Sequence, residues 1–246
     1  MKTRFFLRIA IYSVIIFTFN SLNTNAQIDS SAVAILDKVS FTLGNLQSCS
    51  VNLKTESDIL DARLGSVSYS DNSQVYLKAP DKLFVRKSGD RGNKEFYYDG
   101  KIFTYYSKDI NTYSSASAPP TIMQTIDSIH NTLGIDFPAA DFFYPYFVDQ
   151  LLEVSYNLVN LGITSVNNKK CFHLAGTTTD QTYQIWIADD GTFLPVKLSI
   201  ITVRSGSDEH YTAFYEEWVL NPVLQNSMFD FTAPSDALKV KFSVKK

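Results

Sequence analysis

The apolar residues of this chain recur with a period of two over most of its length. Val51 and Leu53 alternate with polar neighbours, and similar short runs follow one another towards the C-terminal end. Alternation of this kind is typical of strands with one buried face. The runs 96–98 and 102–106 flank Asp99-Gly100, a dipeptide that favours the tight turn of a β-hairpin. The sequence therefore predicts an antiparallel meander.

The strand-like runs form two groups, one before residue 119 and one after residue 152. We expect about eleven strands in all, with a turn at Asp71-Asn72 in the first group. Antiparallel sheets with so many long strands usually curl into a barrel or part of one. The predicted fold class is mainly β with helices (α+β), a curved antiparallel sheet that forms an incomplete β-barrel.

Two helical regions are expected to cover this sheet. Asp29 is a suitable N-cap for a helix of about a dozen residues that ends near Gly44. A helical insertion at about 119–152 interrupts the strands, and its first helix carries apolar residues at 4-3 spacing and ends at Gly134. Its second stretch is apolar nearly all round and is expected to break at Pro145.

The first 26 residues have the pattern of a secretory signal peptide. Basic residues precede the uncharged apolar run Ile9–Phe19, and a stretch of small residues ends at Ala26, ahead of Gln27; this order is typical of an exported precursor. The apolar run is shorter than the ~20 residues of a membrane-spanning helix, and no cysteine follows the cut that could carry a lipid. We expect residues 1–26 to be removed, which leaves residues 27–246 as a single periplasmic domain without an integral membrane span.

The charge balance argues against a nucleic-acid partner. Of the 22 Lys+Arg, three lie in the expected signal peptide, which contains none of the 25 Asp+Glu, so 19 basic residues stand against 25 acidic ones in the mature chain. These charges are interspersed, whereas nucleic-acid binding needs a basic face. We therefore expect no nucleic-acid partner.

The sequence carries no recognisable catalytic or metal-binding constellation. Its three histidines, His130, His173 and His210, lack metal-ligand spacing, and neither a G-x-S-x-G motif nor a phosphate-binding glycine loop occurs. Adjacent carboxylates such as Glu216-Glu217 would point to opposite faces of a strand, although carboxylates from distant strands could still meet. We expect a non-enzymatic protein with no catalytic residue, no metal and no cofactor.

Two cysteines, Cys49 and Cys171, remain in the expected mature chain. An even number in an oxidising compartment permits a disulfide, and both lie in strand-like runs that could be neighbours in a closed sheet. The alternative is that each is a small buried hydrophobic residue, as free cysteine often is. The sequence leaves both alternatives open.

The helical insertion contains most of the candidate ligand-binding residues. Its apolar face either packs on the sheet as ordinary core or forms a lid over a ligand cavity. The abundance of Phe and Tyr and the expected break at Pro145 favour a lid. The candidates on the lid and in the cavity are Ile122, Ile126, Ile129, Phe142, Phe143, Tyr146, Phe147, Val196 and Leu198.

Four segments, residues 96–105, 118–122, 134–141 and 231–237, carry a resemblance to a known family. They are similar to predicted periplasmic proteins of unknown function within the LolA/LolB-like (lipoprotein-localisation carrier) superfamily. The resemblance covers most of the expected mature chain. It implies a half-barrel closed by a helical lid, a periplasmic location and a lipid-like ligand.

Two hypotheses about function follow. In the first, the exported protein binds an apolar ligand (a lipid, a lipoprotein acyl chain or a similar molecule) in the concave barrel beneath the lid. In the second, the concave sheet is a cell-envelope interaction or structural module that binds a protein partner and no small ligand. An open apolar cavity would favour the first, and a filled core with an exposed apolar patch would favour the second.

Overall fold

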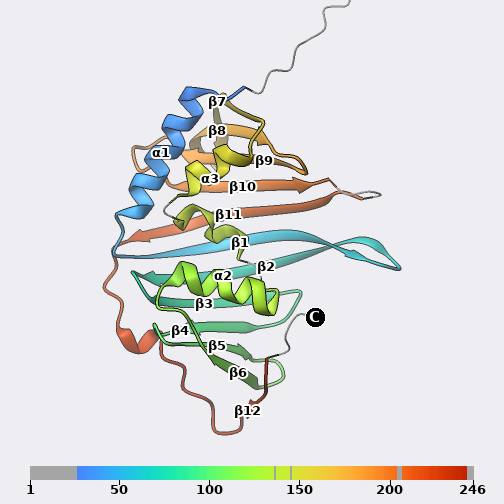
Figure 1. The fold of residues 1–246 in the computed structure, drawn as a ribbon, viewed down its shortest axis with the longest axis vertical. Helices are drawn as coiled ribbons and strands as arrows, with labels where there is room; N and C mark the ends of the chain where they lie inside the picture. The colour runs from blue at the N-terminus through green and yellow to red at the C-terminus, as the bar shows by residue number, and fades with distance from the viewer. Residues whose placement is uncertain (1–26, 136, 145, 204–206, 243–246) are drawn as a thin grey trace, which may run out of the picture.

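The computed structural model describes residues 27–135, 137–144, 146–203 and 207–242. The expected signal peptide lies outside the described residues. Within them, twelve strands form one sheet in the order β12-β6-β5-β4-β3-β2-β1-β11-β10-β9-β8-β7 (Figure 1). The strands are β1 (Ser48–Asp61), β2 (Gly65–Lys78), β3 (Lys82–Gly89), β4 (Lys94–Tyr98), β5 (Ile102–Ser107), β6 (Thr112–Ser117), β7 (Asn157–Val166), β8 (Lys169–Thr177), β9 (Gln181–Ala188), β10 (Pro195–Thr202), β11 (Glu209–Leu220) and β12 (Leu238–Lys239).

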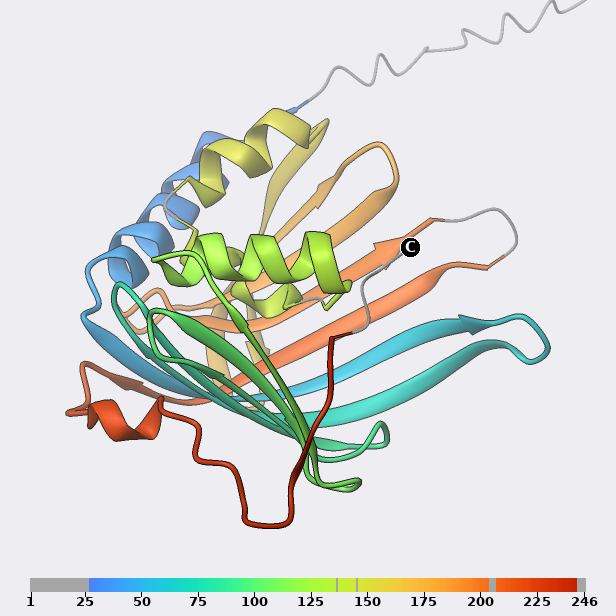
Figure 2. The same ribbon diagram turned by 60° about the horizontal axis from the view of Figure 1, so that its bottom comes forward.

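The sheet is a meander whose two halves meet at its centre. Short connections join β1 to β6 in order and β7 to β11 in order, including the hairpin at Asp99-Gly100, and β1 pairs with β11 to join the halves. The order ends at β7 and β12, so the sheet does not close on itself, and it bends into a deep trough (Figure 2). The predicted incomplete barrel is confirmed; the two-residue strand β12, which pairs in parallel with β6, brings the number of strands to twelve.

One predicted turn is wrong. The expected turn at Asp71-Asn72 lies in the middle of β2, which pairs with β1 without interruption from Asp61↔Gly65 to Ser48↔Lys78. Asp and Asn favour turns because their side chains hydrogen-bond to the nearby backbone. Here the Asp71 carboxylate instead forms ion pairs with side chains from outside β2, and these tertiary contacts override the local preference.

Helices α1, α2 and α3 and the 3-10 helix η1 lie on one side of the sheet, inside the trough, whereas the short 3-10 helix η2 (Asn226–Met228) lies outside it (Figures 1 and 2). Helix α1 (Ser30–Gly44) begins after Asp29, whose carboxylate accepts a hydrogen bond from the Ser31 backbone N–H. Helix α2 (Ile122–Leu133) ends at a left-handed Gly134. The second stretch of the insertion is divided into the 3-10 helix η1 (Pro138–Phe143) and helix α3 (Phe147–Val154). The stretch is thus interrupted as expected, while Pro145 itself, at which the break was predicted, lies outside the described residues.

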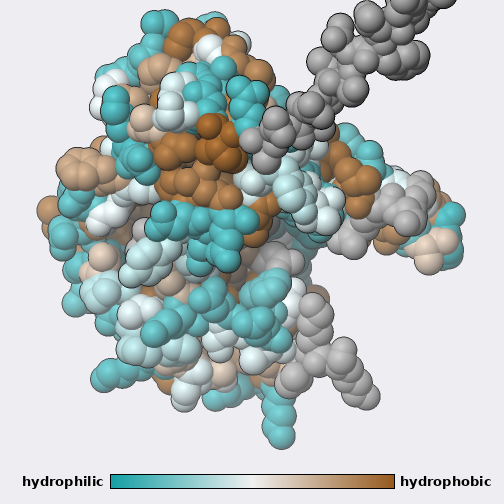
Figure 3. All heavy atoms as spheres, turned by 45° about the horizontal axis from the view of Figure 1, so that its top comes forward, coloured by the Kyte–Doolittle hydropathy of each residue, from teal (hydrophilic) through white to brown (hydrophobic). Residues whose placement is uncertain are grey.

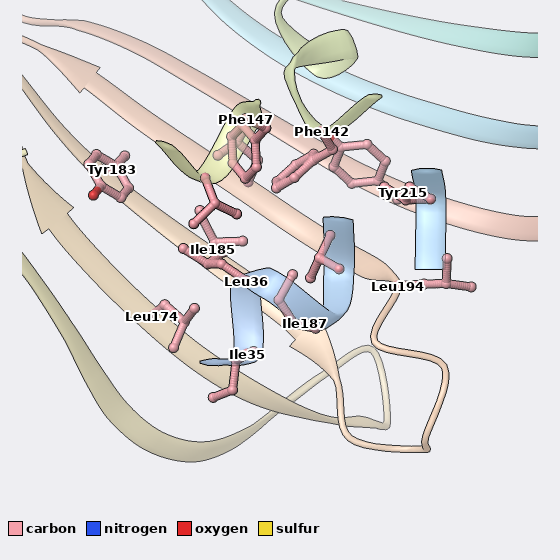
Figure 4. Close-up of a cluster of buried hydrophobic side chains, with 14 of the residues drawn as sticks. Ile35, Leu36, Phe142, Phe147, Leu174, Tyr183, Ile185, Ile187, Leu194 and Tyr215 are labelled. Atoms are coloured by element: carbon pink, nitrogen blue, oxygen red, sulfur yellow. The ribbon is translucent and has the colours of Figure 1, made fainter. Parts of the chain in front are cut away.

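Two separate hydrophobic cores hold these layers together. In the first, α1, η1 and α3 pack on β7–β11, with Leu36, Phe142 and Ile185 among the most buried members (Figure 4). In the second, α2 packs on β3–β5 through Ile122, Ile126 and Ile129. Each large apolar side chain buried in this way contributes about 1.5–3 kcal/mol. The two halves of the insertion are therefore anchored independently, on opposite halves of the trough.

The cysteines do not form the disulfide that the sequence permits. Cys49 and Cys171 are both buried and both free thiols. Cys49 lies on β1 and Cys171 on β8, and strands β11, β10 and β9 lie between them in the sheet. Four strand spacings of ~4.8 Å each far exceed the ~7 Å between Cα atoms that a disulfide can bridge. The alternative interpretation, two small buried hydrophobic residues, is the one that the fold adopts.

A cavity between two cores as candidate functional site

A cavity of about 540 Å³ lies between the concave face of the sheet and the helical insertion. Its floor is formed by β1 to β5 and β11, and its roof by α2, the segment after α2, and η1. Some of its wall residues belong to the first core, such as Leu53 and Tyr215, and others to the second, such as Val85 and Ile126. The cavity is thus the space left between the two cores, where neither set of helices reaches the sheet.

One row of apolar side chains crosses the floor. The residues of this row are direct cross-strand partners on five consecutive strands, so they project to the same face. We call it the apolar row; it consists of Val51, Val75, Val85, Phe96 and Tyr105. The roof opposite adds Ile126, Phe137 and Phe143. An apolar ligand would therefore meet apolar side chains from both sides.

The next row of cross-strand partners, two residues away along each strand, is polar except for its first member, Leu53. Leu53 on β1 pairs with Ser73, which pairs with Lys87, which pairs with Lys94. All four residues line the cavity, and Arg91 in the β3–β4 turn lines it beside them. Neighbouring residues of one face lie about 7 Å apart along a strand. The floor therefore changes from apolar to cationic over a single step.

Asp71 holds two of these cations in place. Its carboxylate, only 2 % exposed, is 2.8 Å from Lys87 Nζ and 2.9 Å from Arg91 Nη2. Burial alone raises the pKa of Asp71, but the hydrogen bonds and charges of Lys87 and Arg91 outweigh it and hold the pKa below its usual value. The folded-state pKa is depressed, so the ion pairs stabilise the fold at neutral pH, and this contribution is lost as the pH falls through the lowered pKa.

The structure places the lid candidates in four different environments. Ile126 and Phe143 line the cavity. Ile122 and Ile129 lie in the second core. Phe142 and Phe147 lie in the first core, where their ring centroids are 4.9 Å apart (Figure 4). Tyr146 is 68 % exposed.

The two candidates on β10 also lie away from the cavity. Leu198 is buried in the first core. Val196 packs on the other face of the sheet, in a small cluster with Cys171 and Trp186. A β-bulge between Pro195 and Lys197 breaks the alternation of β10, so Val196 and Leu198 do not share a face as a strict period of two would require.

Sequence reasoning did not select the floor of the cavity. The apolar row, the cations Lys87, Arg91 and Lys94, and the carboxylate of Asp71 all come from β1 to β5 and their turns. The alternation of apolar and polar residues in the sequence identifies which residues share one face of each strand. A further signal was available in β3, where Leu83, Val85 and Lys87 share a face that is expected to be buried, and a lysine on a buried face indicates a charged partner or a ligand.

Three further properties concern the described residues. None of the helices in the described part of the chain is long and apolar enough to cross a membrane. A space-filling view shows apolar side chains gathered in a patch on one face and bordered by hydrophilic ones (Figure 3). The histidines lie on three different elements, with His130 on α2, His173 on β8 and His210 on β11.

The sequence profile of a family described as predicted periplasmic proteins, DUF2092, matches residues 32–243. The chain belongs to this family. The match confirms the resemblance to predicted periplasmic proteins, and it spans α1, the sheet and the insertion. A search of curated proteins gave no significant match to this DUF2092 member.

Several solved structures are similar to this DUF2092 protein. The lipoprotein LppX of Mycobacterium tuberculosis is 19 % identical, with 80 % of this chain and 99 % of LppX covered and a TM-score of 0.50. An uncharacterised conserved protein of Thermus thermophilus is 12 % identical, with 86 % and 99 % covered and a TM-score of 0.49. A LolA superfamily protein of Nitrosomonas europaea is 13 % identical, with 81 % and 97 % covered and a TM-score of 0.37. The similarity to LppX supports the incomplete-barrel fold alone.

Proposed function

We propose that this protein is a non-enzymatic periplasmic binding protein whose ligand is a lipid, a lipoprotein acyl chain or a similar apolar molecule. In this proposal residues 1–26 direct export and are removed, and residues 27–246 act as one domain. The ligand lies between the apolar row and the roof. The observation that carries the proposal is the apolar cavity between two filled cores.

The packing on either side of the cavity supports the interpretation of this space as a binding site. Val85, Phe96 and Ile126 are almost completely buried, so the protein has enough apolar residues to close a core. Val75 and Phe143, which line the cavity together with these three residues, are only partly buried. Covering such surface contributes about 25 cal/mol per Å². A volume of about 540 Å³ is also within the ~300–1,000 Å³ of typical ligand sites.

A cavity of this kind favours a small ligand over the alternative, an envelope protein partner. A protein partner needs an accessible surface, usually on the order of 800 Å² on each side. The residues of the apolar row instead face inwards, towards a roof formed by α2 and η1. Whether the protein binds a small ligand or a protein partner can be measured directly.

The proposal predicts that the protein carries a ligand when it is purified from the periplasm of cells expressing the full chain. Native mass spectrometry should show the mass of the chain from Gln27 plus one lipid-sized adduct, which organic extraction removes. The extracted protein should then bind a fluorescent acyl probe with one-to-one stoichiometry. A bare protein mass together with no binding of the probe would contradict the proposal.

A hydrogen bond between the two halves of the roof should control ligand exchange. Tyr144, in the segment between η1 and α3, donates its hydroxyl to Asp127 Oδ1 of α2 at 2.6 Å. Tyr144→Phe removes a bond worth ~1 kcal/mol net, which corresponds to about fivefold faster release of a bound acyl probe. The unfolding free energy should change by no more than ~1 kcal/mol. Stopped-flow dissociation and chemical denaturation measure the two quantities.

Tyr156→Phe is the matched control for this prediction. Tyr156 pairs its hydroxyl with Thr179 Oγ1 at 3.1 Å, and neither residue lines the cavity between the cores. Equal release rates for the two variants would show that Tyr144 does not hold the roof.

A further inference from the structure

The polarity of the cavity differs sharply between its two ends. Val85 lies in the apolar row and Lys87, two residues further along β3, lies in the polar row. The same step separates Phe96 from Lys94 on β4. The same end is also lined by Thr55, Ser57 and the apolar Ile59 of β1 and by Tyr211 of β11. A ligand that fills this cavity has to match an apolar part with a polar part.

Among the residues that line the polar end, three are cations and none is a carboxylate. The cations are Lys87, Arg91 and Lys94. Asp71 is paired with Lys87 and with Arg91, whereas Lys94 has no ion-pair partner among the residues that the structure describes. Cations that line a cavity close together, one of them without an ion-pair partner, are suited to an anion.

The titration of Lys94 points in the same direction. Burial lowers its pKa, and the positive charges of Lys87 and Arg91 lower it further. Asp71 and Asp109 oppose this effect without cancelling it. A bound anion would favour the charged form of Lys94 and would neutralise the repulsion among the three cations.

We infer that the ligand is a single-chain amphiphile with an anionic head group, a carboxylate or a phosphate. This inference rests on the proposed function and deepens it. The chain lies along the apolar row beneath Ile126 and Phe143, and the head group accepts a hydrogen bond from Lys94 Nζ beside the guanidinium of Arg91. A volume of about 540 Å³ holds roughly eighteen groups of the ~30 Å³ that one water occupies in the liquid. A methylene is of comparable size, so the cavity accommodates one long acyl chain.

The test compares two lipids that differ only in the head-group charge. The extracted protein is titrated with palmitoyl lysophosphatidic acid and with monopalmitoylglycerol, which lacks the phosphate, and separately with glycerol 3-phosphate. We expect the phosphorylated lipid to bind at least about tenfold more tightly than the neutral one. Glycerol 3-phosphate, which has no chain, should bind at least about a hundredfold more weakly than the phosphorylated lipid, because it leaves the apolar row uncovered.

Lys94→Met is the variant of choice because it removes the charge but keeps a long side chain. Lys87 is unsuitable, since its loss would leave the buried carboxylate of Asp71 with one partner fewer. Lys94→Met should lower the affinity for the phosphorylated lipid about tenfold and leave the affinity for monopalmitoylglycerol unchanged. Lys101→Met, at an exposed turn residue, is the control and should change neither affinity.

The outcomes separate this inference from the proposed function. Equal affinity for both lipids, unaffected by Lys94→Met, would overturn the anionic head group while leaving apolar binding intact. Glycerol 3-phosphate binding as tightly as the phosphorylated lipid would overturn the amphiphile and indicate a site for free anions. If neither lipid bound, both the inference and the proposed function would fail.

Discussion

Phe142→Ala is expected to lower the free energy of unfolding by about 3–5 kcal/mol, the usual cost of truncating a buried phenylalanine. Phe142 is 2 % exposed. Its ring centroid lies 4.9 Å from that of Phe147 and 5.7 Å from that of Tyr215 (Figure 4). Because it fixes η1 to the first core, the loss combines the transfer of the ring with a cavity that its neighbours cannot fill. Chemical denaturation measures the change.

Phe143→Ala is the matched control, because the neighbouring residue makes a different contact. Phe143 is only partly buried and lines the cavity, so its truncation should cost less stability, about 1–2 kcal/mol. It should weaken the binding of an acyl probe in a protein that remains folded. The prediction fails if the two variants lose equal stability, since Phe142 and Phe143 would then not be divided between core and cavity.

Val75→Trp should abolish binding of an apolar ligand, with an affinity loss of about a hundredfold or more. Val75 is the second member of the apolar row, between Val51 and Val85, and it borders the cavity. An indole at this position would occupy the space of the acyl chain. Because the indole enters a void, the loss of stability should stay at or below the ~1–3 kcal/mol typical of an overpacked core. Titration with a fluorescent acyl probe and thermal unfolding test both statements.

Val219→Trp is the control for the size of the new side chain. Val219 is on β11, is 49 % exposed and is not part of the cavity wall. The Val219→Trp variant should bind the fluorescent acyl probe as tightly as the parent protein does. Retention of full binding by Val75→Trp would show that the ligand does not lie on the apolar row.

Several elements could be predicted because their causes are local. The turn of the hairpin at Asp99-Gly100 needs a positive φ, and Gly100 adopts a φ of 91° without a steric penalty. Helix α2 begins after Thr121, whose hydroxyl accepts from the Gln124 N–H, and ends at Gly134, and both are capping signals that can be read from the sequence. The number of strand-like runs with alternating apolar residues indicated the curved sheet.

The division of the insertion between core and cavity depended on distant residues. The sequence presents Phe142 and Phe143 as equivalent members of one apolar stretch. Only the position of η1 between α1 and β11 turns Phe142 towards Tyr215 and leaves Phe143 at the cavity. Local propensity contains no information on which of two adjacent phenylalanines meets a partner from another part of the chain.

What the sequence by itself determined was which segments are strands and helices and where most of them begin and end, because caps, turn residues and apolar periods act over a few residues. The tertiary structure alone decided the registers that align Val51, Val75 and Val85 in one row. It also decided that Asp71 stays in a strand, because a buried carboxylate is stabilised there by Lys87 and Arg91. A cavity is the space that packing leaves between distant segments, so its shape and its charge emerge only when those segments are brought together.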